Sequence, residues 1–278
     1  MQPVVHRTAQ GLSLVGSAFG PEAGRPVLLF HGGGQTRHAW GGTGEALGRA
    51  GFRAIAWDQR GHGDSDWAQA YTPQAFADDV LEIARAQPRR PYIVGASMGG
   101  IAGMVANASS AGEISDALVL VDVAPRLNGP GVERILDFMA AHPQGFADLD
   151  EAAAAVGAYQ PQRAQKGDRS GLQKNLRQRA DGRWYWHWDP AMLATFDRAH
   201  QMSQSAEGLY HAAEKLTQPV LLVRGTLSDV IDESITREFQ QRIPQARVAD
   251  VSGAGHMVAG DRNDVFLDAV LEFLRALP

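Results

Sequence analysis

The segment PYIVGASMGG, residues 91–100, places a serine between small residues directly after a short apolar run. The residues that follow it, GGIAGMVANAS, are typical of a helix. A strand that passes into a helix through Gly95-x-Ser97-x-Gly99 fits the strained turn that presents a nucleophilic serine, because small flanking residues let strand and helix approach. Ligands collect at the carboxyl ends of the strands in a parallel sheet. We therefore predict that Ser97 is a nucleophile at such an end.

Apolar runs of strand length recur along the chain and predict a sheet around this turn. The runs are continuous and rich in Val, Ile and Leu, as in parallel strands that are covered on both faces. Segments with helical spacing lie between and after them, for example residues 73–87 and 264–277. This alternation predicts an α/β fold with an open parallel sheet. The runs are PVLLF (26–30), RAIAW (53–57), PYIVG (91–95), ALVLVDV (117–123) and PVLLVRG (219–225).

Composition narrows the class of protein. The chain has 278 residues, 44% of them hydrophobic and 21% charged, which allows a full core and excludes a disordered chain. The formal charge of −5 is not gathered in blocks, so neither nucleic acid nor a membrane surface is an expected partner. The absence of cysteine excludes disulfides, a thiolate nucleophile and cysteine metal sites. No basic start precedes a long apolar run, and we expect a cytoplasmic protein.

One long segment interrupts the alternation of strands and helices. Residues 126–213 contain no strand-like run of comparable strength, while helix formers and the aromatic stretch RWYWHW (183–188) gather there. A segment of this length is too long for a loop. We predict a mainly helical cap over the sheet, with the α/β core formed by residues 1–125 and 214–278.

A serine nucleophile needs a base, and His256 is the strongest candidate. It stands in VSGAGHMVAGD (251–261), a glycine-flanked loop after the last predicted strand and before the C-terminal helix. The chain order Ser, Asp, His supports this role. We expect His31 and His62 to organise a loop and a turn. His187, in the aromatic stretch, is a candidate for substrate contact.

The carboxylate that orients the base has alternatives. Asp229, in VRGTLSDVIDE (223–233), follows a predicted strand and is the favoured choice. Asp122 ends the apolar run before the cap and competes with it, and Asp232 is a weaker third choice. Each of these aspartates also has a structural reading, because aspartate commonly caps helices or stabilises turns.

A glycine-rich loop supplies candidate donors for an oxyanion. In LLFHGGGQTRHAW (28–40), three glycines follow the strand that ends at Phe30. Beside a nucleophile, they allow an unhindered backbone amide to face the developing negative charge, and the amide of Met98 is the expected second donor.

These motifs together resemble the α/β-hydrolase superfamily, particularly its capped esterases, lactonases and cofactor-free haloperoxidase or perhydrolase relatives. The motifs are HGGGQTRHAW (31–40), DQRGHGDSD (58–66), GASMGG (95–100), RGTLSD (224–229) and GAGHMVAGDRNDVF (253–266). The resemblance implies an eight-stranded, mostly parallel sheet flanked by helices. It also implies a triad of Ser97, Asp229 and His256, with an oxyanion hole from the amides of Gly33 and Met98.

The resemblance further implies structural roles for His62 and Asp64 and chemistry without a metal or organic cofactor. Serine at the nucleophile position argues against haloalkane dehalogenases and epoxide hydrolases, which use aspartate there. The stretch GTLSD has one residue more before Asp229 than the commonest form of this loop, which keeps Asp122 open as the acid.

We accordingly expect a serine hydrolase of small, largely apolar esters or lactones. Carbon–carbon bond hydrolysis and perhydrolysis are alternatives on the same triad, and a ligand sensor is an alternative outside catalysis. The sequence does not predict an oligomeric state. Alternation places Trp184, Trp186 and Trp188 on one side of an extended segment. They either fill the core of the cap or, with Phe138, Met139 and Trp40, bind substrate above Ser97.

Overall fold

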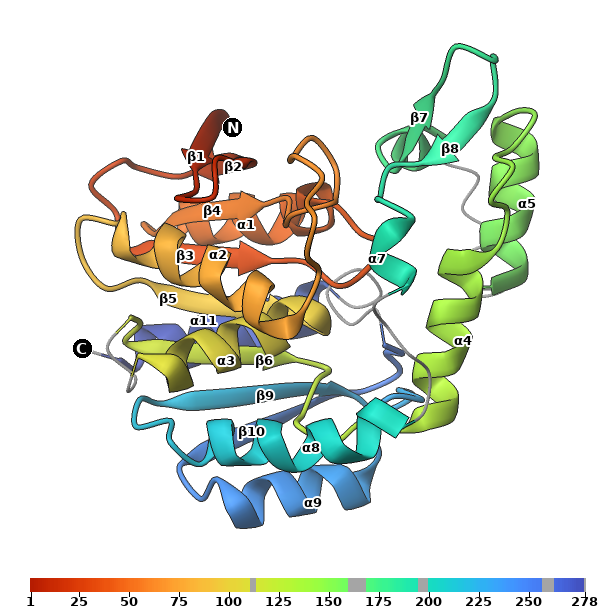
Figure 1. Cartoon of the computed structure of the whole chain (residues 1–278). Helices are drawn as coiled ribbons and strands as arrows, with labels where there is room; N and C mark the ends of the chain where they lie inside the picture. The colour runs from red at the N-terminus through yellow and green to blue at the C-terminus, as the bar shows by residue number, and fades with distance from the viewer. Residues whose placement is uncertain (111–113, 160–168, 195–199, 257–262, 278) are drawn as a thin grey trace.

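The computed structural model describes residues 1–110, 114–159, 169–194, 200–256 and 263–277. At its centre is an eight-stranded sheet with the order β1-β2-β4-β3-β5-β6-β9-β10 (Figure 1). The pairs β1–β2 and β2–β4 are antiparallel and the others are parallel, which confirms the predicted α/β class. The strands are β1 (Gln2–Arg7), β2 (Ser13–Phe19), β3 (Pro26–Phe30), β4 (Arg53–Trp57), β5 (Tyr92–Ala96), β6 (Ala117–Val121), β9 (Val220–Gly225) and β10 (Ala246–Val251).

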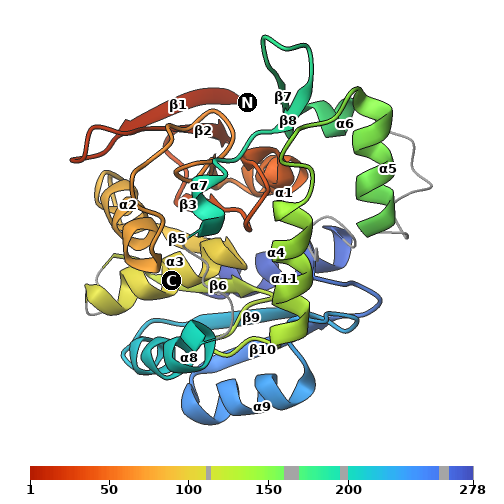
Figure 2. The same ribbon diagram turned by 45° about the vertical axis from the view of Figure 1, so that its right-hand side comes forward.

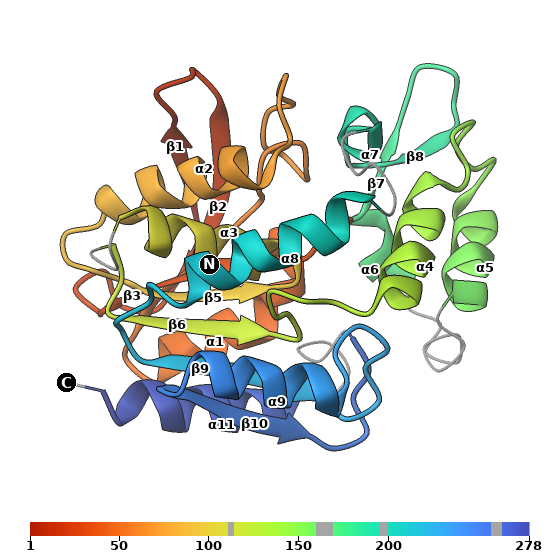
Figure 3. The same cartoon turned by 60° about the horizontal axis from the view of Figure 1, so that its bottom comes forward.

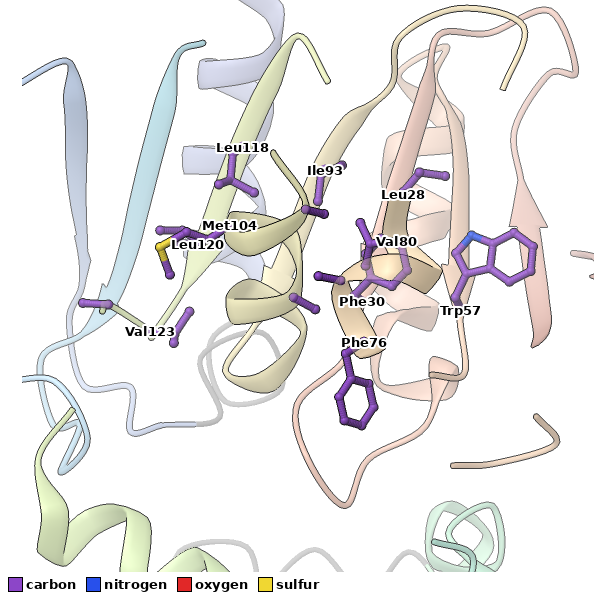
Figure 4. Close-up of a cluster of buried hydrophobic side chains, with 14 of the residues drawn as sticks. Leu28, Phe30, Trp57, Phe76, Val80, Ile93, Met104, Leu118, Leu120 and Val123 are labelled. Carbon is purple, nitrogen blue, oxygen red and sulfur yellow. The ribbon is translucent and has the colours of Figure 1, made fainter. Parts of the chain in front are cut away.

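Helices cover both faces of the sheet, so the central strands are apolar throughout. In β3, Leu28 and Phe30 face one core cluster, and Val27 and Leu29 face the other. Figure 4 shows the first cluster, in which Phe30 lies near side chains of α2 and the adjacent strands. The helices α1 (Gly41–Arg49) and α11 (Asn263–Arg275) cover one face, and α2 (Pro73–Arg85), α3 (Met98–Ser109), α8 (His200–Ala213) and α9 (Glu233–Arg242) cover the other (Figure 3).

Side-chain caps begin two of these helices. The hydroxyl of Thr72 accepts a hydrogen bond from the amide of Ala75 at 3.2 Å, and Pro73 opens α2. At α9, the carboxylate of Asp232 accepts from the amide of Ile235 at 2.8 Å. Asp232, the weakest of the three candidate acids, therefore caps α9.

A separate group of helices and strands stands at the carboxyl ends of the strands of the sheet (Figures 1 and 2). Leu176 of β7 pairs with Trp186 of β8, so part of the predicted helical segment is an antiparallel hairpin. In contrast, α8 packs against α3 of the core. The elements of the group are α4 (Gly129–Ala140), α5 (Leu149–Tyr159), α6 (Arg169–Gln173), β7 (Leu176–Gln178), β8 (Trp184–Trp186) and α7 (Ala191–Ala194). We call this group the cap.

Within the described ranges, no helix combines the length and apolar character needed to cross a membrane.

Candidate active site

Ser97 occupies the turn between β5 and α3 with a backbone conformation that side chains rarely adopt. Its φ is 47° and its ψ is −117°. The backbone amide of Ser97 donates to the carbonyl of Val121 at 3.1 Å, and its carbonyl accepts from the amides of Gly100 and Ile101. Neighbouring strand and helix therefore hold the strained residue in place, as a preorganised nucleophile requires.

The glycines around Ser97 are required by close backbone contacts. A Cβ atom on Gly95 would lie 2.4 Å from the carbonyl oxygen of Gly99, and one on Gly99 would lie 2.5 Å from that of Phe30. Real Cβ atoms do not approach oxygen so closely. The glycines of the motif Gly95-x-Ser97-x-Gly99 are needed because β5, α3 and the end of β3 meet there.

The imidazole of His256 is paired with a buried carboxylate. Its Nδ1 atom lies 2.7 Å from Oδ2 of Asp122, whose side chain is fully buried after β6. A carboxylate only accepts hydrogen bonds, so Nδ1 carries the proton and Nε2 is left as a free base. The other oxygen of Asp122 accepts from the amide of Gly225 at 3.0 Å, and the hydroxyl of Ser228 donates to Oδ2. The arrangement has the geometry of an oriented general base.

The predicted pairing of His256 with Asp229 is wrong in this structure. The carboxylate of Asp229 lies 2.5 Å from the guanidinium of Arg134 in α4, and its carbonyl accepts from the side-chain amide of Asn128 at 2.9 Å. Gly131 of α4 packs against the same carbonyl, from which an added Cβ would be only 2.2 Å away. The beginning of the cap thus holds Asp229 away from His256. The hydroxyl of the preceding residue, Ser228, instead bonds to the carboxylate of Asp122.

The glycine loop after β3 leaves one amide available beside Ser97. The amide of Gly32 donates to Oε1 of Gln35 at 3.0 Å, and the amide of Gly34 donates to Nε2 of His62 at 3.2 Å. Among the described residues, the Gly33 amide donates no hydrogen bond to another backbone group. Met98 is the first residue of α3, where amides lack acceptors within the helix. Both predicted oxyanion donors line the same cavity as Ser97.

The cavity between core and cap has a volume of about 470 Å³. Ser97 and His256 lie at its core side, and most of its remaining wall is apolar. The cap contributes Val132, Ile135, Leu136, Phe138, Met139, Val156, Tyr159, Trp186, Trp188 and Met192. The indoles of Trp186 and Trp188 are stacked, with ring centroids 4.8 Å apart, and Phe138 stacks on Tyr159 at 4.1 Å. This wall can surround an apolar group attached to an ester carbonyl.

Two of the predicted substrate contacts lie outside the cavity. Trp40 is only 1% exposed and packs against Phe266 of α11, on the opposite face of the sheet. Trp184 does not line the cavity, and its partly buried side chain packs against the core cluster. The prediction that these two residues bind substrate is corrected, whereas Phe138, Met139, Trp186 and Trp188 do line the cavity.

The motif DQRGHGDSD forms a network that joins core and cap. The carboxylate of Asp64 lies 2.8 Å from Arg37 and 2.7 Å from Arg177 of β7. Arg37 also bonds to the fully buried carboxylate of Asp58. Partial burial disfavours the charge of Asp64, but the hydrogen bond and charge of Arg37 outweigh it and lower the pKa of this carboxyl. Asp64 therefore acts in a structural ion-pair network.

Sequence reasoning identified Phe138 and Met139 of α4 but missed the other side chains that α4 and α5 contribute to the cavity. Val132, Ile135 and Met139 recur at helical spacing and face the site from α4. That spacing was a usable signal. Tyr159, at the end of α5, had none in the sequence. Among the described residues, no group of three or more His, Asp or Glu side chains is arranged to hold a metal ion.

Comparison with known proteins agrees with the fold. The family model described as alpha/beta hydrolase fold matches residues 25–262. The chain belongs to the α/β-hydrolase family and is a hydrolase enzyme. It is 30% identical to "Esterase Rv0045c" of Mycobacterium tuberculosis over 96% of this chain and 88% of that protein. It is 28% identical to "3-hydroxybutyrate-oligomer hydrolase" of Cupriavidus necator over 74% and 73% of the two chains.

A solved structure shows the same fold over the whole chain. The crystal structure of E-2-(acetamidomethylene)succinate hydrolase superposes with a TM-score of 0.84 and 24% identity, covering 99% of this chain and 100% of that one. The relatives support ester hydrolysis in general as the activity of this enzyme.

Proposed function

We propose that the protein hydrolyses carboxylic esters or lactones of small, largely apolar molecules through an acyl-enzyme on Ser97. The observation that carries the proposal is that Ser97 and His256 line one cavity while His256 is held by the buried carboxylate of Asp122. Asp122 takes the place that the sequence analysis favoured for Asp229.

The first half of the reaction transfers the acyl group to the enzyme. Nε2 of His256 removes the hydroxyl proton of Ser97 as Oγ attacks the ester carbonyl. The amides of Gly33 and Met98 stabilise the tetrahedral oxyanion. When the intermediate collapses, the bond to the alkoxide breaks and His256 returns the proton to the leaving alcohol. Asp122 keeps the required tautomer and stabilises the imidazolium.

Water completes the cycle. His256 Nε2 takes a proton from water as its oxygen attacks the acyl carbon, and collapse of the second tetrahedral intermediate releases the carboxylic acid. The proton then returns to Ser97 Oγ. No step uses a metal or an organic cofactor.

The apolar cap wall favours an apolar acyl or ring group. Each buried methylene contributes about 0.8 kcal/mol, so kcat/KM is expected to change gradually with acyl length. The cavity wall also includes polar side chains, such as Thr36, His38 and Asn175, which can contact an ester or lactone oxygen of the substrate.

The experiment compares the wild type with Ser97→Ala on p-nitrophenyl esters of increasing acyl length and on a panel of lactones. We expect multiple turnovers by the wild type, near-complete loss in Ser97→Ala, and fluorophosphonate labelling at Ser97 alone by mass spectrometry. Ser109→Ala is the matched control, because its hydroxyl bonds to the carbonyl of Val105 away from the cavity. A folded Ser97→Ala enzyme with wild-type turnover would contradict the mechanism. A single turnover without release would indicate a ligand sensor.

A further inference from the structure

Three buried histidines stand in a row behind the glycine loop. His31 and His62 come from the core, and His187 follows β8 of the cap. The ring centroids of His31 and His62 are 4.9 Å apart, and those of His62 and His187 are 5.8 Å apart. Burial lowers the pKa of His31 to about 4 and of His62 to about 3, and it lowers the pKa of His187 well below 6.5. All three rings are therefore neutral near pH 7.

The hydrogen bonds of His187 define its tautomer. Its Nδ1 atom accepts from the amide of Gly63 at 2.7 Å, so the ring proton is on Nε2. That nitrogen faces the carbonyl oxygen of Gly34 at 3.4 Å and is the donor to it. Because His62 accepts from the amide of the same glycine, both polar backbone groups of Gly34 are held by imidazoles.

The peptide group that joins Gly32 to Gly33 is held by the third histidine, His31. Nδ1 of His31 donates to the carbonyl of Gly32 at 2.8 Å. In a trans peptide the following N–H points opposite to that carbonyl, so the amide of Gly33 is directed away from His31. The Gly33 amide thus belongs to a peptide group held by His31, and the next two peptide groups along the loop are held by His62 and by His187 of the cap.

His187 is itself anchored firmly enough to act in this way. Its backbone amide donates to the carbonyl of Asn175 at 3.2 Å, and the residue is only 3% exposed. Two residues further, the amide of Asp189 donates to the carbonyl of Gly61, and its carboxylate accepts from the hydroxyl of Tyr71 at 2.5 Å. The chain around the ring is thus bonded to the neighbouring cap segment at His187 and to the core at Asp189.

We propose that His187 is a positioning residue through which the cap sets the direction of the oxyanion donor at Gly33. This inference rests on the proposed function, because it assigns the hydrogen bond to Gly34 a role in stabilising the tetrahedral intermediate. The cap then contributes to the rate of the chemical step as well as to the wall of the cavity.

Two amide substitutions separate the two hydrogen bonds of the ring. In His187→Asn, the side-chain amide reaches the position of Nδ1 and can accept from Gly63, but it is too short to reach Gly34. In His187→Gln, the longer side chain places an N–H near the position of Nε2 and can donate to Gly34. We expect kcat for p-nitrophenyl butyrate to fall about tenfold in the Asn variant with little change in KM. This loss is smaller than the roughly 10²–10³-fold effect of deleting an oxyanion donor.

The Gln variant is expected to recover most of kcat. The control is His211→Asn, which changes an exposed histidine bonded to the carbonyl of Glu207 in α8. Wild-type kcat in His187→Asn would overturn the inference. The inference would also be overturned if His187→Asn and His187→Gln lost kcat to the same extent and melting temperature to the same extent. That result would indicate a role in folding alone.

A measurement independent of turnover distinguishes failure of this inference from failure of the proposed function. Nitrogen-15 NMR of the ring in the wild-type protein is expected to show a protonated Nε2 and an unprotonated Nδ1 at neutral pH. The opposite tautomer in an enzyme that hydrolyses esters would overturn the inference alone. The expected tautomer in a protein that hydrolyses no ester or lactone would overturn both, with the fault in the proposed function.

Discussion

The imidazole of His256 and the carboxylate of Asp122 are joined by a 2.7 Å hydrogen bond between Nδ1 and Oδ2. Asp122 has a φ of 49°, and its amide donates to the carbonyl of Val223 in the neighbouring strand at 2.8 Å. Its two oxygens accept from three donors in all, one of them the imidazole. A carboxylate held in this way stays oriented, and a histidine bonded to it keeps one tautomer.

The first prediction ranks the two candidate acids. In Asp122→Asn, the side-chain amide can donate to Nδ1, which moves the ring proton to Nε2 and removes the base. We expect kcat to fall by up to about 10⁴-fold, as for other triads with the wrong tautomer. In Asp229→Asn, only a partly exposed ion pair to Arg134 is lost, so kcat should change by less than about threefold. Steady-state kinetics on one ester checks this ranking, and the reverse order would return the acid to Asp229.

The second prediction concerns the turn that holds Ser97. Gly99→Ala would place a Cβ 2.5 Å from the carbonyl of Phe30. Backbone on both sides must then shift, and we expect the free energy of unfolding to fall by about 2 kcal/mol or more. Gly208→Ala is the control, because nothing lies within 4 Å of its Cβ and the position is inside α8. There, alanine should raise the free energy of unfolding by about 0.5–1 kcal/mol. Urea unfolding measures both.

Local sequence signals predicted the sheet and two of the catalytic candidates, because those signals depend on near neighbours. The runs at residues 26–30 and 53–57 coincide with β3 and β4. Ser97 and His256 are recognised by the glycines beside them and by their places after strands. In each case, the glycines and the strand end that the backbone requires lie within a few residues of the side chain.

The carboxylate that pairs with His256 was not predictable in the same way, because its identity depends on contacts distant in the sequence. Ser228 and Asp229 are adjacent, and a difference of one residue decides which faces His256. That choice is made by Asn128, Gly131 and Arg134 of the cap, which hold Asp229. The tryptophans show the same limit. Their alternation predicts a shared side, but only packing separates a core ring from one at the cavity.

The third prediction is a loss of stability in mild acid. The pKa of His31 is about 4 and that of His62 about 3 in the folded protein, against 6.5 for the free group. Below pH 6.5, the unfolded chain binds protons at these residues and the folded chain does not, so stability falls as the pH falls toward 4. Each such histidine contributes a slope of about 1.4 kcal/mol per pH unit. Above about pH 7, both states are neutral and the slope vanishes.

Urea unfolding at about pH 7.5, 6 and 5 measures this slope. These conditions lie above the range in which Asp64 loses its stabilising charge, because its pKa is lowered below 3.8 in the folded state. His187→Gln removes one of the three buried imidazoles, so its slope between pH 6 and 5 should be smaller than that of the wild type. Equal slopes in the two proteins would show that His187 is not a buried neutral group.

The last prediction separates tryptophans at the cavity from tryptophans in the core. Trp186 and Trp188 are stacked and line the cavity, whereas Trp40 is buried against Phe266. Trp188→Leu should shift the dependence of kcat/KM on acyl length toward longer chains, because a smaller side chain leaves room for about one or two more methylenes, each contributing about 0.8 kcal/mol. Trp40→Leu should lower the free energy of unfolding by about 2–3 kcal/mol and keep the parental profile. The measurement is kcat/KM over p-nitrophenyl esters from acetate to octanoate, with urea unfolding of each variant. A parental profile in Trp188→Leu, together with a loss of stability like that of Trp40→Leu, would assign Trp188 to the core of the cap and leave the acyl group to the side chains of α4 and α5.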